Sequence, residues 1–206
     1  MTPARFITLE GGEGVGKTTQ RARLAAAIRG RGYQVIETRE PGGTPGAEAI
    51  RALLMTGAID RWSPRVEALL FAAARADHVE RVIRPALDAG SWVVCDRFVD
   101  STRAYQGAAG TVSDADILAL HRIGSCNLLP DRSLLLTVPA SDSEQRLVAR
   151  GNRDRMGDRD AAFYARVDKG FRCFAQAAPE RWRVVDAAGS VEAVTTRLVE
   201  AIEDLL

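Results

Sequence analysis

The chain has 206 residues, of which 46% are hydrophobic and 27% are charged, so it can bury a sizeable core. Its 28 basic and 27 acidic residues nearly cancel, which disfavours a general nucleic-acid binder. Its longest apolar runs, such as residues 7–9 and 134–136, are far too short to cross a membrane, and the first residues carry no signal-peptide pattern. Three cysteines without a C-x-x-C pair fit neither a disulfide framework nor a zinc site. We therefore expect a reduced, cytoplasmic protein with no nucleic-acid or membrane partner.

The first half of the chain alternates between short apolar runs and amphipathic segments. In order, it predicts a strand at residues 5–9, a helix at 17–31, a strand at 33–38, helices at 47–55 and 64–87, and a strand at 92–95. The helix at 64–87 has the clearest start, because Ser63 can cap it and Pro64 suits its first position.

The second half continues the alternation. It predicts a helix at residues 113–124, a strand at 133–138, helices at 141–150 and 161–178, a strand at 182–186 and a helix at 191–206. Between two of these helices, residues 151–160 form a polar, arginine-rich loop. Alternating strands and helices predict an α/β fold in which helices cover both faces of a five-stranded parallel sheet. No repeat or linker divides the chain, so we expect residues 1–206 to form a single domain.

A phosphate-binding motif, G-x-x-x-x-G-K-[ST], follows the first predicted strand and opens the first helix. Its residues are Gly11, Gly12, Glu13, Gly14, Val15, Gly16, Lys17 and Thr18. Glycines let backbone N–H groups converge on phosphate oxygens, and the helix N-terminus adds positive potential. Lys17 can neutralise the β- and γ-phosphates, and the Thr18 hydroxyl can bind Mg²⁺. The motif predicts a three-layer P-loop NTPase fold that binds a nucleoside triphosphate, rather than a glycine turn with an incidental lysine.

Lysine is otherwise almost absent. Apart from Lys17 it occurs only at Lys169, and subtracting these two from the 28 basic residues leaves 26 arginines. A chain with this bias would be expected to carry arginine at an arbitrary basic position, so Lys17 hints at a site that needs a compact ammonium group. We expect Lys169 to lie on a solvated helix face.

Two further residues, Asp96 and Arg97, end the strand predicted at 92–95, and ligands of open α/β sheets bind at such strand ends. Asp96 could act on Mg²⁺ or its waters and Arg97 could clamp a phosphate, although a surface ion pair is the alternative. The chain has no N-K-x-D guanine signature and is short for a motor or a transporter. These observations leave the small phosphotransferases.

The order of these motifs resembles the bacterial thymidylate kinases over essentially the whole chain. The matching blocks are LEGGEGVGKTTQ (residues 9–20), TREPGGT (38–44), LLFAAARADH (69–78), DRFVDSTRAYQG (96–107), PDRSLLL (130–136) and ARGNRDR (149–155). The resemblance implies phosphorylation of dTMP to dTDP with ATP and Mg²⁺, by direct phosphoryl transfer in a homodimeric enzyme. A related adenylate- or cytidylate-type kinase and a catalytically weak ATP-binding regulator are the alternatives.

The resemblance also assigns roles to single residues of the dTMP site. Glu13 would approach the deoxyribose 3′-hydroxyl, and Tyr105 would leave no room for a ribose 2′-hydroxyl. Arg97 would hold the dTMP phosphate, with help from Arg39 and with Ser101 nearby.

For the base, the resemblance implies that Phe71 stacks on thymine and Arg75 bonds its carbonyl edge, while Thr102 and Gln106 complete the pocket. The spacing of four residues between Phe71 and Arg75 is consistent with this, because it puts both side chains on one helix face. Phe71 taken alone would more often be a core residue.

A lid at about residues 150–160 is implied as well, and two departures bear on it. No glutamate follows Asp154 and Arg155, and the strand before the lid lacks the family's usual acid near residues 137–138. The residues expected to act on the transferring phosphoryl group are Lys17, Asp96, Arg97, Arg150 and Arg155, with Arg153 ranked lower. Thr18 and Asp96 would hold Mg²⁺, partly through water. No general base is needed, because a phosphate monoester with a second pKa near ~6 is already largely dianionic at neutral pH.

Overall fold

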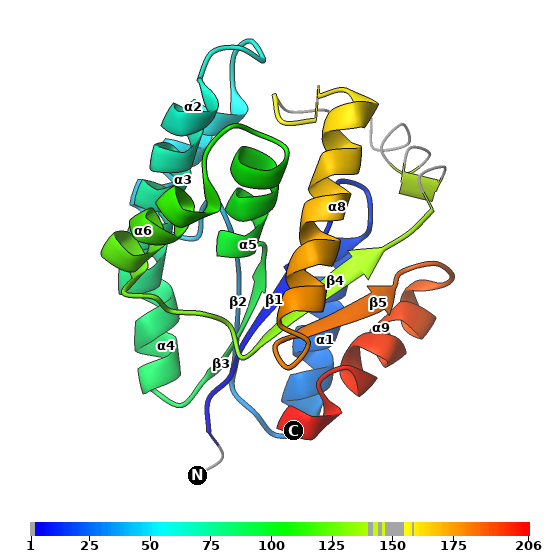
Figure 1. Ribbon diagram of the computed structural model, residues 1–206. Coiled ribbons are helices and arrows are strands. Elements are labelled where there is room, and N and C mark those ends of the chain that lie inside the picture. Colours follow the sequence, from blue (N-terminus) through cyan, green and yellow to red (C-terminus); the bar gives the residue numbers. More distant parts are fainter. Residues whose placement is uncertain (1–2, 140–141, 144–145, 147–154, 158) are drawn as a thin grey trace.

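The computed structural model describes residues 3–139, 142–143, 146, 155–157 and 159–206. Its centre is a parallel sheet in the order β2-β3-β1-β4-β5, confirming the predicted architecture (Figure 1). The strands are β1 (Phe6–Glu10), β2 (Val35–Arg39), β3 (Trp92–Asp96), β4 (Arg132–Thr137) and β5 (Trp182–Asp186). Each strand overlaps its predicted range. The inner strands β1, β3 and β4 are buried along almost their whole length, as in the middle of a parallel sheet, whereas the edge strands β2 and β5 mix buried and exposed residues.

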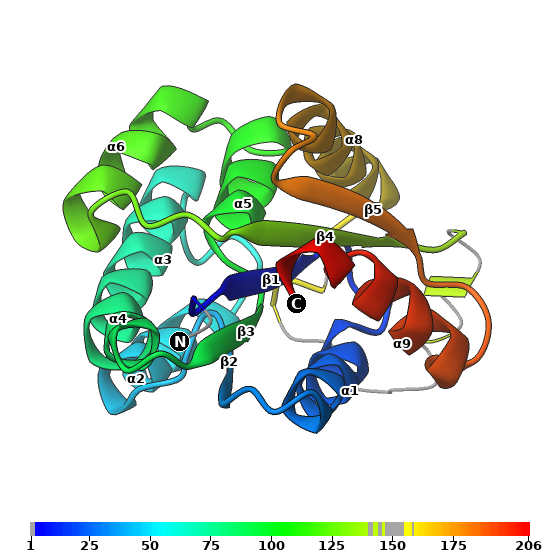
Figure 2. The same cartoon turned by 90° about the horizontal axis from the view of Figure 1, so that it is seen from below.

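Helices cover both faces of the sheet. The longer helices are α1 (Lys17–Gly30), α2 (Pro45–Met55), α3 (Pro64–His78), α6 (Asp114–Ser125), α8 (Ala161–Ala177) and α9 (Val191–Glu200). Figure 2 shows α1 and α9 on one face, with α5 (Val99–Thr102) and α8 on the other. Within the described residues, no helix has the length and apolar content needed to cross a membrane.

The core follows the two-residue period of the strands. On β1, Ile7 and Leu9 pack towards α1 and α9, where they meet side chains such as Leu24 and Leu198. Phe6 of the same strand packs towards the opposite layer, against Phe98 at an edge-to-face ring distance of 4.9 Å. Both faces of β1 are therefore buried, as a central parallel strand requires.

Most helix boundaries agree with the sequence, including the cap at Ser63, whose hydroxyl accepts the Val66 N–H at 3.4 Å. The predicted helix at 64–87 is helical throughout, but a π-helical segment (Val79–Ile83) separates α3 from α4 (Arg84–Asp88). The last predicted helix is shorter than expected, since α9 ends at Glu200 and only a 3₁₀ turn (Glu203–Leu205) follows. Of the helix predicted at 141–150, only residues 142, 143 and 146 are described, and all three are helical.

One helical segment was not predicted. α5 and the π-helical segment that follows it (Arg103–Ala108) run directly on from the end of β3. Most of their side chains are buried, including polar ones such as Ser101 and Gln106. A helix enclosed by protein has no solvent-facing polar stripe, so the periodicity that reveals surface helices is missing.

Candidate active site

A pocket of about 740 Å³ opens at the carboxyl ends of β1 and β3. β1 is the central strand of the sheet, and it has β3 on one side and β4 on the other. Ligands of open α/β sheets bind at this kind of position. The parallel register pairs Leu9 with Asp96, and this brings the end of β3 beside the start of the phosphate loop. The loop and the residues after β3 therefore share one cavity.

The phosphate loop has a backbone that only glycine adopts readily. Gly11, Gly14 and Gly16 have φ values of 130°, 75° and 99°. A Cβ on Gly11 would also lie 2.5 Å from the Leu136 carbonyl oxygen, so β4 packs directly against the loop. Gly16 precedes α1 and has no side chain with which to cap it, so the first N–H groups of the helix are left for a ligand.

Lys17 is buried in this pocket. Its ammonium donates to the carbonyl oxygens of Gly11 at 3.2 Å and Gly12 at 2.5 Å. Burial, and secondly the charge of Arg97, lower the pKa of Lys17 to about 8, although nearby carboxylates such as Glu13 act in the opposite direction. Because its partners among the described residues are neutral carbonyls, the ammonium can turn to phosphate oxygens without breaking an ion pair with them.

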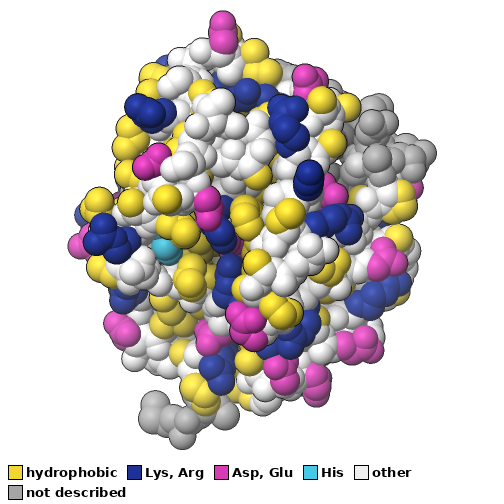
Figure 3. Space-filling view, viewed as in Figure 1, with side chains coloured by type: hydrophobic (Ala, Val, Ile, Leu, Met, Phe, Trp, Pro, Cys, Tyr) yellow, Lys and Arg dark blue, Asp and Glu magenta, His cyan; other side chains and the backbone are white. Residues whose placement is uncertain are grey.

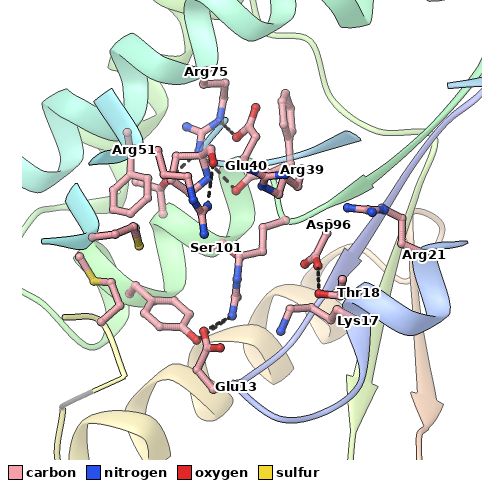
Figure 4. A pocket seen from close by; sticks show the side chains of 18 of the residues that line it. Glu13, Lys17, Thr18, Arg21, Arg39, Glu40, Arg51, Arg75, Asp96 and Ser101 are labelled. Carbon is pink, nitrogen blue, oxygen red and sulfur yellow. Dashed lines mark hydrogen bonds and ion pairs between the residues drawn. The ribbon is translucent and has the colours of Figure 1, made fainter. Parts of the chain in front are cut away.

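Thr18 connects the phosphate loop to β3. Its hydroxyl donates to Asp96 Oδ2 at 2.9 Å, and Figure 4 shows the two side chains facing each other beside Lys17. Among the described residues, no three His, Cys, Asp or Glu side chains gather as a metal cluster. One hydroxyl and one carboxylate are enough for Mg²⁺, which in nucleotide sites keeps several waters and takes phosphate oxygens as ligands.

Arg97 lies between the loop and the segment after β3. Its guanidinium donates to the Gly11 carbonyl at 2.9 Å and to Ser101 Oγ at 3.1 Å. It pairs with Glu13 at 2.5 Å and lies over the Tyr105 ring, 5.1 Å from the centroid. Its backbone is left-handed, with φ 72°. This conformation is unusual for a residue with a Cβ, and such outliers cluster at functional sites.

Glu10 holds the segment that carries these residues and was not singled out in the sequence. Its carboxyl accepts the Phe98 N–H at 2.9 Å and the Ser101 hydroxyl at 2.6 Å. Burial, and secondly the charge of Asp100, raise the pKa of Glu10 to about 8. The available signal was a carboxylate at the end of a buried strand, directly before the phosphate loop.

The far side of the pocket is built from α3 and α5. Phe71 and Arg75 both line it, which agrees with the prediction from their spacing that they share one helix face. Arg75 is buried, with Nε on Glu40 at 2.8 Å and Nη2 on Thr102 Oγ1 at 2.8 Å. Glu40 also bonds His78, at 3.1 Å. His78 is therefore a buried partner of Glu40, and Glu40 is a second carboxylate whose contacts with α3 the sequence did not reveal.

Apart from Arg97 and Arg155, several arginines that line the pocket or were expected there form three groups. Arg39 lines the pocket and is half-exposed, with an ion pair to Glu48 at 2.8 Å. Arg51 and Arg146 also line the pocket and were not predicted. Arg150 and Arg153 lie outside the described residues.

Arg155 is not brought to the pocket. It is buried, with Nε donating to the Leu54 carbonyl at 2.8 Å and Nη1 to the Ile59 carbonyl at 3.0 Å. Nη1 also lies 2.7 Å from Glu67 of α3. Its position in the Asp154–Arg155 pair suggested a phosphate ligand, but the structure uses it to attach the segment before α8 to α2 and α3.

The geometry defines a class of protein. The phosphate loop and Arg97, which bonds the loop at the Gly11 carbonyl, share one pocket that Phe71, Arg75 and Tyr105 also line. This arrangement is that of a P-loop phosphotransferase whose acceptor is itself a nucleotide.

Comparisons with known proteins identify the family. The thymidylate kinase family model matches residues 9–198. The thymidylate kinase of Rhizorhabdus wittichii is 60% identical over 206 residues, covering 99% of each chain, and that of Caulobacter vibrioides is 49% identical, covering 98% of this chain and 97% of the relative. The crystal structure of thymidylate kinase from Ehrlichia chaffeensis superposes with a TM-score of 0.78 at 30% identity, covering 97% of this chain and 99% of that one. The chain belongs to the thymidylate kinase family, whose enzymes phosphorylate dTMP to dTDP with ATP as phosphate donor.

Proposed function

We propose that the two sides of this pocket bind the two substrates of the family's reaction. ATP places its phosphates on the phosphate loop and Lys17, while dTMP lies between Phe71 and Tyr105 with its phosphate on Arg97. The observation that carries the assignment is the adjacency of Asp96, the last residue of β3, and Arg97, which follows it. Asp96 bonds Thr18 on the ATP side, and Arg97 contacts Ser101 and Tyr105 on the dTMP side.

Mg²⁺ fits the ATP side. Thr18 and Asp96 present oxygen atoms next to each other at the mouth of the phosphate loop, and these are the ligand types that Mg²⁺ prefers. We propose that these two residues hold the ion, partly through water. When bound, the ion neutralises charge on the phosphates of ATP.

The remaining chemistry is the approach of two anions. The dTMP phosphate is already dianionic, so the protein's task is to orient it and to stabilise charge on the transferring group. Lys17 and Arg97 both donate to the Gly11 carbonyl, so their two positive charges lie side by side next to that point. Glu13 pairs with Arg97, and we propose that its carboxylate also accepts a hydrogen bond from the sugar 3′-hydroxyl.

A homodimer is also proposed, in the cytoplasm. α3 and α6 pack together, and they expose the large apolar side chains Leu69, Leu118 and Ile123. Hydrophobic side chains are visible on the side of the molecule where these helices lie (Figure 3). A second copy would cover such a surface.

A coupled ADP-release assay with a series of nucleoside monophosphates tests the substrate assignment. We expect dTMP to be the best substrate and dUMP to be about 10–200-fold poorer, because the two differ by one methyl group in an apolar pocket. Ribothymidine monophosphate should be rejected more strongly, since Tyr105 is buried against Phe163 and Phe171 and cannot move aside. Tyr105→Phe should keep this discrimination, because the ring excludes the hydroxyl.

Other outcomes of the assay would favour the alternatives. Preference for dCMP or AMP would indicate a different nucleotide kinase, and ATP binding without monophosphate-dependent ADP release would indicate a regulator. Equal use of dTMP and its ribose analogue would contradict the role given to Tyr105.

The lid arginines should separate into two kinds of variant. Arg155→Ala should lower the free energy of unfolding by roughly 3 kcal/mol, because it removes one partner of a buried ion pair, and urea denaturation measures this. Arg150→Ala should leave stability unchanged and lower turnover, towards the roughly 10³–10⁵-fold effect of a phosphate-directed arginine. Arg153→Ala is the matched control and should change turnover least. If Arg155→Ala lost turnover but kept the wild-type free energy of unfolding, Arg155 would act on the transferring phosphoryl group and not as a structural residue.

A further inference from the structure

Gln106 has one end of its side-chain amide occupied and the other unsatisfied. The residue is 2% exposed and lines the pocket on its thymine side. Its Nε2 donates to Glu67 Oε2 at 3.0 Å. Its Oε1 is buried and has no hydrogen-bond partner among the described residues. A buried acceptor without a partner is costly in a folded protein, and beside a ligand pocket it indicates an atom that the ligand satisfies.

The hydrogen bond to Glu67 determines which end of the Gln106 side-chain amide is left for the pocket. The carboxylate is 1% exposed, and its Oε1 lies 2.7 Å from Arg155 Nη1 and 3.2 Å from Arg159 Nη2. Its partners are therefore two guanidinium groups, and a carboxylate paired in this way only accepts hydrogen bonds. The Gln106 amide must therefore turn its NH₂ group to Glu67, which leaves its carbonyl for the pocket.

We propose that Glu67 is a positioning residue that fixes Gln106 so that its carbonyl accepts the N3–H of the thymine base. The inference rests on the proposed binding of dTMP in this pocket. A glutamine on its own could rotate and serve as donor or acceptor, so it would not distinguish an N3–H from a bare ring nitrogen. With Glu67 in place, Gln106 offers only an acceptor.

Arg75 completes the pattern. Its guanidinium lines the same pocket and can only donate, so it suits a base carbonyl. A donor beside an acceptor matches the 4-carbonyl and N3–H of thymine and uracil. Cytosine presents the reverse pattern, an amino group and a bare N3, and is therefore refused at two positions. Such buried polar mismatches discriminate far more strongly than a missing methyl group.

Arg155 and Arg159 hold the Glu67 carboxylate in place. Both come from the segment just before α8, and both donate to the oxygen of Glu67 that Gln106 does not use. One carboxylate oxygen of Glu67 is therefore bound by the segment before α8, and the other binds the side-chain amide of Gln106. It touches no substrate atom in this scheme, since Gln106 stands between it and the pocket.

The test measures KM for dTMP and for 5-methyl-dCMP, which keeps the methyl group but has a bare N3 and a 4-amino group. In the wild type the analogue should have a KM at least roughly tenfold higher, because the Gln106 carbonyl meets a bare nitrogen and is left unsatisfied. In Glu67→Gln the amide at position 106 is no longer fixed and can turn its NH₂ group to N3, so the ratio of the two KM values should fall several-fold, to the mismatch that remains at Arg75. A general loss of packing would raise both KM values together and leave their ratio unchanged.

Asp100→Asn is the matched control. Asp100 is also a buried carboxylate between two arginines, with Arg181 at 2.6 Å and Arg103 at 2.9 Å, and it does not bond Gln106. Its variant should lose stability and keep the wild-type KM ratio. A collapsed ratio in Asp100→Asn would show that any buried defect produces the effect, and this would overturn the proposal.

A double variant that combines Glu67→Gln with Gln106→Glu provides a rescue and guards against misfolding of the single variant. The amide now at position 67 can donate to the carboxylate now at position 106 and accept from the arginines. Both oxygens of that carboxylate accept, so an acceptor faces the pocket again and the wild-type KM ratio should return. An unchanged ratio in folded Glu67→Gln, or a collapsed ratio in the double variant, would overturn the proposal. A wild-type ratio near 1 would instead refute the placement of thymine beside Gln106.

Discussion

Replacing Lys17 with alanine should lower turnover about 10²–10³-fold or more and leave the fold intact. Within the described part of the chain, Lys17 bonds the carbonyls of Gly11 and Gly12 and forms no ion pair, so its removal breaks none there. It does remove the positive charge at the phosphate loop, and the loss of a single preorganised donor at a transferring group has effects of this size. Steady-state kinetics measures the loss, and circular dichroism with thermal unfolding verifies the fold.

Lys169→Ala is the natural control, because it removes the other lysine of the chain. Lys169 is exposed on α8, as its sequence context predicted, so its variant should behave as the wild type. A folded Lys17→Ala protein with near-normal activity would contradict the assignment of the phosphate loop.

The second large effect is expected for Arg97→Lys, a loss of about 10²–10³ in kcat/KM for dTMP. Lysine keeps the positive charge but has no planar fork, so it cannot bond Glu13 and Ser101 together and still face a phosphate. Both residues carry a Cβ, so the left-handed backbone costs the same before and after the change. The variant therefore isolates the guanidinium.

Arg103→Lys serves as the control for Arg97→Lys. Arg103 follows β3 in the same segment and pairs with Asp100 and Asp114, but it does not line the pocket. Its variant should retain wild-type kcat/KM. If Arg97→Lys also retained it, Arg97 would only brace Glu13, and the phosphate of dTMP would be held elsewhere.

The parts of the site that could be predicted are those encoded within a few residues. The phosphate loop, and Asp96 with Arg97 at a strand end, lie in short motifs whose chemistry follows from their local setting. The inner strands were predictable for the same reason, since each is a short and mostly apolar run between turn signals. The buried helix after β3 was not, because burial on all sides removes its periodicity.

The carboxylates that hold the site together could not be found in this way. Glu10 bonds Ser101 across 91 positions, and Glu40 bonds Arg75 across 35. In the sequence each is an ordinary charge on a strand or loop. Only the packing of the sheet and α3 brings their partners within reach. Arg155 is the opposite case. Its position in a short motif predicted that it binds phosphate, but in the fold its guanidinium pairs with Glu67.

The scarcity of lysine gives the nucleotide site a chemical handle. At pH 8 about half of the Lys17 side chains would be neutral amines, because their pKa is about 8, whereas an ordinary lysine with a pKa of 10.5 would be on the order of 0.3% neutral. The neutral amine is the form that attacks acylating reagents. A small reagent that enters the pocket should therefore label Lys17 ahead of Lys169, and bound ATP should protect it. Mass spectrometry of one peptide would then report nucleotide-site occupancy directly, without any measurement of phosphoryl transfer.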